Sequence, residues 1–221
     1  MSKRVLTGIP GFDELCRGGL PEVGTYLVSG VAESGKTLFA MQFIVNGARM
    51  FEEPGIYITT EEGPQHIRER FSVWQIEELE DENMLAIIDA RLNLNVEEVA
   101  AIQNEICAKR AVLDSVTAIG FSRSPLELGA ELLGISVAMK TLGLTSIFTC
   151  QTTKDEPTEF CVEQVAADGL IVLHYLKDEF ESRGIEIVKM EGSDHSEWIH
   201  PFEITKRGIV IYPRNEVFWT R

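Results

Sequence analysis

Short apolar runs alternate with longer stretches of helical spacing along most of the chain. The apolar runs have the length of buried strands and fall at residues 25–29, 55–60, 84–90, 111–114, 145–151 and 169–175. The stretches with helical spacing fall at 37–51, 63–74, 95–110 and 126–142. Strands that alternate with helices predict an α/β fold, with a mostly parallel central sheet flanked by helices.

The last part of the chain has a different pattern. Residues 184–190, 201–205 and 208–213 are short runs in which apolar and polar residues alternate, with turn residues between them. This pattern predicts antiparallel hairpin strands that complete the sheet. The length of 221 residues suits one folding unit, so we expect a single domain over residues 1–221.

Composition and charge narrow the function. The net charge is −15, and an acidic surface repels both the phosphates of nucleic acid and anionic membranes. The alternative is that this acidity serves only solubility. Without a run of 18 apolar residues we expect no membrane span. The four cysteines form no C-x-x-C pair, which is typical of reduced thiols, so a soluble cytoplasmic protein is expected.

One motif points to a nucleotide. Residues 30–37, GVAESGKT, fit the pattern G-x-x-x-x-G-K-[ST] and lie between an apolar run and a helical stretch. In such a loop backbone N–H groups surround a phosphate, Lys36 reaches the β- and γ-phosphates, and the Thr37 hydroxyl ligates Mg²⁺. The alternative is an ordinary glycine turn. The predicted nucleotide-binding residues are Gly30, Val31, Ala32, Glu33, Ser34, Gly35, Lys36, Thr37 and Leu38.

Glu33 introduces a negative charge in the middle of this loop. A carboxylate about 5 Å from the phosphates would cost a few kcal/mol at an intermediate dielectric. A carboxylate that faces solvent would cost little, because the loop binds through its backbone. We therefore expect the Glu33 side chain to point outward.

Polar residues at the ends of the predicted strands are candidates for the remaining chemistry. Asp114 ends the run AVLD and could hold Mg²⁺ through its water shell. Glu61 or Glu62 could act as general base on the attacking water, and Gln151 could hydrogen-bond the γ-phosphate or the water. Each also has a plainer interpretation, since Asp, paired Glu and Gln are common at solvated strand ends.

Several ordered segments together resemble the KaiC-like ATPases of the RecA/RadA superfamily. They are TGIPGFDELCRGGLPEVG, the phosphate loop, EPGIYITTEE, LDSVT, AADGLIVL, GIEIVKMEGSDHS and PFEITKRGIVIYP. The resemblance covers nearly the whole chain. It implies a RecA-like P-loop NTPase fold, bound ATP and Mg²⁺, and a homo-oligomer that is often a hexameric ring with ATP between subunits.

The resemblance also implies residues that act on the neighbouring subunit's nucleotide. The family segment K-x-R-G-T-S-H corresponds to residues 189–195, and Lys189, His195 and Arg183 are the candidates. Two residues depart from the family. Glu33 replaces a common glycine, and Glu191 replaces an arginine of the kind that stabilises transition-state charge. These departures predict slow turnover.

The function predicted first is Mg²⁺-dependent ATP binding with slow hydrolysis, in a self-assembling regulatory or signalling ATPase with an unidentified protein partner. The circadian clock members of the family carry adjacent Ser and Thr phosphorylation sites. The corresponding residues 155–169 contain only Thr158, so autokinase activity is not expected. One alternative is a non-hydrolysing ATP-binding regulatory subunit, so enzymatic activity stays open. Another is a recombinase-like DNA-binding ATPase, disfavoured because residues 152–168 hold one lysine and five acids.

Overall fold

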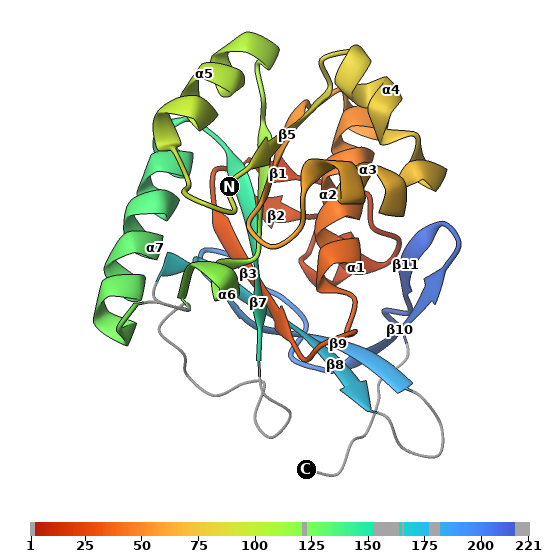
Figure 1. Ribbon diagram of the computed structural model, residues 1–221. Helices are drawn as coiled ribbons and strands as arrows, with labels where there is room; N and C mark the ends of the chain where they lie inside the picture. Colours follow the sequence, from red (N-terminus) through yellow and green to blue (C-terminus); the bar gives the residue numbers. More distant parts are fainter. Residues whose placement is uncertain (1–2, 121–122, 153–163, 165, 177–181, 215–221) are drawn as a thin grey trace.

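The computed structural model describes residues 3–120, 123–152, 164, 166–176 and 182–214. In this part of the chain a large sheet lies between two layers of helices (Figure 1). The strand order is β11-β10-β9-β8-β3-β7-β6-β4-β5. The strands are β3 (Thr25–Gly30), β4 (Gly55–Thr59), β5 (Leu85–Asp89), β6 (Arg110–Asp114), β7 (Thr145–Gln151), β8 (Gly169–Leu176), β9 (Ser182–Met190), β10 (His200–Thr205) and β11 (Gly208–Ile211).

The direction of the strands divides the sheet into two parts. Strands β3 to β8 pair in parallel with one another. Strand β9 pairs antiparallel with β8, and β10 and β11 continue the sheet antiparallel. The predicted α/β fold, with a mostly parallel sheet and antiparallel strands at its C-terminal end, is confirmed.

Helices cover both faces of this sheet. They are α1 (Phe12–Leu15), α2 (Lys36–Phe51), α3 (Pro64–Arg70), α4 (Ile76–Asp81), α5 (Val96–Ile106), α6 (Val116–Gly120) and α7 (Pro125–Thr141). Because side chains alternate along a strand, Tyr26 and Val28 of β3 pack in the core below α1, α2 and α4, and Leu27 packs in the opposite core with α5 and α7. Figure 1 shows these two helical layers on either side of the strands.

Some elements were not predicted. Strands β1 (Arg4–Val5) and β2 (Leu20–Pro21) form a separate two-stranded sheet, and they are too short to show a periodicity. The stretch 63–74, expected as one helix, is divided into α3 and the 3₁₀ helix η1 (Ser72–Trp74). Residues three apart eclipse in a 3₁₀ turn, and here the rings of Phe71 and Trp74 lie 5.5 Å apart.

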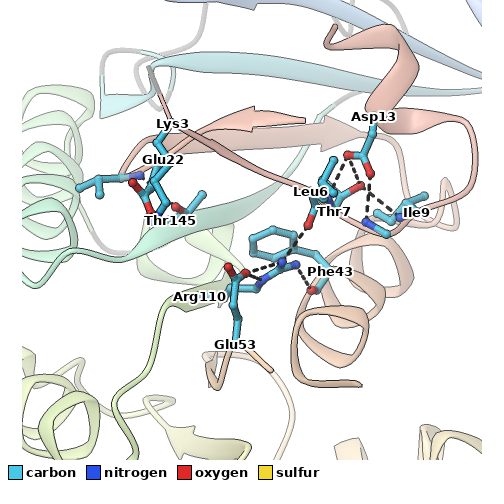
Figure 2. A network of polar contacts seen from close by, with 12 residues as sticks. Lys3, Leu6, Thr7, Ile9, Asp13, Glu22, Phe43, Glu53, Arg110 and Thr145 are labelled. Carbon is cyan, nitrogen blue, oxygen red and sulfur yellow. Dashed lines mark hydrogen bonds and ion pairs between the residues drawn. The ribbon is translucent and has the colours of Figure 1, made fainter. Parts of the chain in front are cut away.

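A buried arginine joins the N-terminal segment to the sheet (Figure 2). The Arg110 side chain on β6 is fully buried and ion-paired with Glu53, 2.6 Å away. It also donates to the backbone carbonyls of Phe43 at 2.8 Å and Leu6 at 2.7 Å. A buried charge is tolerated when it is paired and hydrogen-bonded. This network therefore connects the segment that precedes α1 to the middle of α2 and to the residues that follow this helix.

None of the helices in the described ranges is both long enough and apolar enough to cross a membrane. The acidic segment 152–168, on which the argument against DNA rests, lies mostly outside the described residues, and so does Thr158.

Candidate functional site

The phosphate loop connects the end of β3 to the start of α2. Its backbone is tightly folded, because Glu33 and Gly35 adopt positive φ angles of 65° and 105°. A β-carbon on Gly30 would lie 2.5 Å from the Leu173 carbonyl oxygen and 2.6 Å from the Ser34 hydroxyl. Only glycine fits at that position. The loop thus delivers the chain to the N-terminus of a 16-residue helix, where backbone N–H groups and the helix dipole favour an anion.

Lys36 lies over this loop. Its ammonium group donates to the carbonyl oxygen of Val31 at 2.8 Å. Burial lowers the pKa of Lys36, and the nearby charges of Asp114 and Glu61 act against that shift by raising it. Asp114 and Glu61 are therefore close enough to Lys36 to interact with its charge beside the phosphate loop.

Asp114, at the end of β6, is held by two hydroxyl groups. The Tyr57 hydroxyl donates to Oδ2 at 2.5 Å, and the Thr149 hydroxyl donates to Oδ1. Tyr57 belongs to β4 and Thr149 to β7, the two strands that flank β6. Burial, followed by the charge and hydrogen bond of Asp114, raises the pKa of Tyr57 well above its usual value, so Tyr57 stays a neutral donor.

The two adjacent glutamates have different surroundings. Glu61 accepts a hydrogen bond from the hydroxyl of Ser115, the residue after Asp114. Glu62 instead forms an ion pair with Arg70 of α3. The structure therefore places Glu61 beside Asp114 and Lys36 and ties Glu62 to the helix that follows.

Gln151 ends β7 next to the beginning of the phosphate loop. It pairs in register with Gly30, and its backbone N–H donates to the Thr117 hydroxyl at 2.8 Å. The side chain is exposed. The structure thus brings Gln151 to the loop, as the strand order requires.

A cavity of about 770 Å³ opens beside the loop. Sequence reasoning missed most of its lining, because that lining comes from three separated segments. Residues 33 and 35–38 of the loop and α2 form one side, residues 70, 71, 73 and 74 a second, and residues 205, 206 and 208 of the β10–β11 hairpin a third. The closest signal in the sequence is the aromatic pair Phe71 and Trp74 after the glutamates.

The three residues assigned to a neighbouring subunit lie apart from one another. Arg183 on β9 donates to the Glu33 carbonyl of its own chain at 2.7 Å, with its guanidinium 3.8 Å from the Tyr175 ring centroid. Lys189 pairs with Glu191 at 2.6 Å. His195 lines a second, polar cavity of about 480 Å³. Their role between subunits stays a prediction.

The residues present fit a magnesium ion bound together with phosphates. Mg²⁺ is usually held by one or two protein groups plus substrate phosphates and water, and the described part of the chain contains no cluster of three His, Cys, Asp or Glu residues that could hold a metal without them. Thr37 in the first turn of α2 and Asp114 are the two groups that would hold such an ion. The Ser34 hydroxyl in the loop is buried without a hydrogen-bond partner among the described residues, whereas buried polar atoms normally have one.

A glycine loop between a strand and a helix, with Lys36 and a strand-end acid facing it, places the chain in the class of RecA-like P-loop ATPases. Within that class, residues 5–216 match the family model described as KaiC ATPase, and the chain belongs to this family.

The matches to known proteins cover almost the whole chain. A UPF0273 protein of Thermotoga maritima is 38% identical over 96% of this chain and 97% of its own length. A KaiC-like protein of Pyrococcus horikoshii, known from a crystal structure, is 36% identical with a TM-score of 0.86, covering 96% of this chain and 100% of that one. The circadian clock oscillator protein KaiC of Parathermosynechococcus lividus is 36% identical over 94% of this chain, which spans only 42% of that relative.

Proposed function

We propose that the chain binds ATP with Mg²⁺ at residues 30–38 and hydrolyses it slowly, as a regulatory ATPase that assembles with itself. The observation that carries this proposal is the meeting of Lys36, Asp114 and Glu61 at the carboxyl ends of neighbouring strands, beside the phosphate loop. In open α/β sheets ligands bind at such ends.

The loop and its helix would hold the triphosphate. Backbone N–H groups of the loop and of the first turn of α2 would donate to the phosphates, and Lys36 would exchange its contact with the Val31 carbonyl for phosphate oxygens. Mg²⁺, when bound, neutralises charge on the β- and γ-phosphates. Thr37 and Asp114 are the groups that would hold it.

The cavity beside the loop would receive the nucleoside. Phe71 and Trp74 give it an apolar wall, and Arg70 and Lys206 add positive charge at its edge. Ligand sites of this kind combine apolar lining with a few polar groups. The cavity also contacts Thr37 and Leu38, so phosphates and base would bind in continuous space.

Glu61 is the best candidate for the general base. Its carboxylate is exposed and beside Ser115 and Asp114, where it could take a proton from an attacking water. Glu62 instead forms an ion pair with Arg70, which ties its carboxylate to α3. Gln151, beside Gly30, could orient the same water.

We further propose that residues 1–221 work as one domain, in a homo-oligomer such as a hexameric ring. In it Lys189 and His195 would approach a neighbouring subunit's nucleotide. The protein would act in the cytoplasm on a protein partner, without autokinase activity and without binding nucleic acid.

A second candidate is a non-hydrolysing ATP-binding regulatory subunit. It is favoured by the ion pair between Lys189 and Glu191, which places a carboxylate where the family resemblance implies an arginine. Such an arginine contributes on the order of a thousandfold or more in rate.

Steady-state phosphate release, measured with the oligomer mass on the same sample, separates the two. The proposal predicts turnover that appears as the protein assembles and is absent in Lys36→Ala. ATP that stays bound to an assembled protein without phosphate release would instead support the regulatory subunit.

A further inference from the structure

Hydrogen bonds from within the protein fix both carboxylate oxygens of Asp114. Its two carboxylate oxygens accept hydrogen bonds from two different strands, Oδ2 from Tyr57 and Oδ1 from Thr149. A carboxylate has about four acceptor positions, so two positions remain for other donors. The orientation of the carboxylate is therefore fixed while part of its acceptor capacity is still available.

The Tyr57 side chain reaches Asp114 along the direction of the strands. In the register between β4 and β6, Tyr57 lies opposite Val112 and Thr59 lies opposite Asp114. Side chains two residues apart share a face, so a long side chain at position 57 can extend from the core toward the strand end. The hydroxyl group at its tip meets the carboxylate there.

Packing alone does not require this hydroxyl group. The Tyr57 side chain is fully buried in the core that α2 covers, where a phenylalanine ring would fill almost the same volume. A buried hydroxyl costs free energy unless it is hydrogen-bonded, and its partner here is Asp114. The hydroxyl group of Tyr57 thus orients the Asp114 carboxylate rather than filling space in the core.

We propose that Tyr57 is a positioning residue for the magnesium ion of bound Mg²⁺-ATP, acting through Asp114. By fixing Oδ2, it aims the remaining acceptor positions of the carboxylate at the water shell of the metal. Groups that orient a metal-binding carboxylate typically change metal affinity by about 10- to 100-fold when removed. This inference rests on the proposed function, because it assumes that Mg²⁺-ATP binds at this site.

The test compares Tyr57→Phe with Tyr26→Phe. Tyr26 is as deeply buried on strand β3 of the same sheet, but its hydroxyl donates to the Pro21 carbonyl at 2.6 Å. Affinity for a fluorescent ATP analogue is measured with excess Mg²⁺ and with a metal chelator, together with the melting temperature of each variant. Tyr57→Phe is expected to weaken binding about tenfold with Mg²⁺ and to leave metal-free binding unchanged. Tyr26→Phe is expected to match the wild type in both conditions.

The outcomes are separable. Equal weakening with and without metal, no weakening at all, or failure of Tyr57→Phe to fold would each overturn the positioning role. A wild-type protein that binds no ATP in either condition would overturn the proposed function itself, and this inference with it.

Discussion

Glu33 combines a charge with a strained backbone. Its φ angle of 65° lies in the left-handed region, which costs an L-residue other than glycine roughly 1 kcal/mol. Its side chain is exposed, and its carbonyl oxygen accepts a hydrogen bond from Arg183. The family resemblance implies glycine at this position. We therefore expect the backbone conformation of Glu33 to affect the stability of the loop more than its charge affects the binding of ATP.

Glu33→Gly is expected to raise stability by about 1 kcal/mol, which is about 2–4 °C in melting temperature for a chain of this size. ATP affinity is expected to change by less than about threefold, or 0.7 kcal/mol. Glu33→Ala is the matched control, because it removes the carboxylate but keeps the β-carbon, and it should not gain stability. A large increase in affinity in both variants would show that the carboxylate faces the phosphates.

The different partners of Glu61 and Glu62 lead to a second prediction. Glu61→Gln should lower ATP turnover by about a hundredfold or more, the usual contribution of a general base, and spare ATP binding. Glu62→Gln changes the neighbouring residue in the same way and should lower turnover by less than about tenfold, because Glu62 is paired with Arg70. Phosphate release under saturating ATP checks both, and the reverse order would move the base to Glu62.

At the scale of elements, the sequence predicted what is periodic or marked by a motif. The parallel strands of the large sheet followed from apolar runs, its antiparallel strands followed from short alternating runs, and Asp114, Glu61 and Gln151 were noticed from their places at strand ends. The cavity beside the phosphate loop could not be predicted in this way, because its walls meet only through the tertiary fold and the 3₁₀ turn at residues 72–74. The burial of Arg110 could not be predicted from the sequence either, since a charged residue at the start of a strand usually faces solvent.

The network around Arg110 gives a prediction about stability. Glu53→Gln leaves the buried guanidinium without its counter-charge, although the carbonyls of Phe43 and Leu6 remain. We expect a loss of about 3 kcal/mol, the lower end for breaking a buried pair. Lys3→Gln breaks the ion pair with Glu22, which Figure 2 also shows, in an exposed setting. It should leave the melting temperature unchanged, and equal effects of the two changes in thermal unfolding would contradict the buried role of Arg110.

At the scale of the whole molecule, the proposal depends on contacts between copies of the chain. Lys189 and Glu191 neutralise each other on the segment that the family resemblance directs at a neighbouring nucleotide. Glu191→Arg would release Lys189 and add a guanidinium that can stabilise charge in the transition state.

Glu191→Arg should therefore raise turnover at least about tenfold in the assembled protein and leave it unchanged in dilute, unassembled samples. Glu98→Arg makes the same charge change on the exposed surface of α5 and should have no such effect. Turnover measured against protein concentration checks the prediction. An increase that does not depend on assembly would contradict a role between subunits.

The most direct test of the central claim is calorimetric titration of residues 1–221 with ATP in the presence of Mg²⁺, alongside Lys36→Ala. We predict one ATP per chain for the wild type and an affinity at least about a hundredfold weaker for Lys36→Ala, a difference of about 2.7 kcal/mol. Undiminished binding by Lys36→Ala, or no binding by the wild type, would contradict the assignment of residues 30–38 as a nucleotide site.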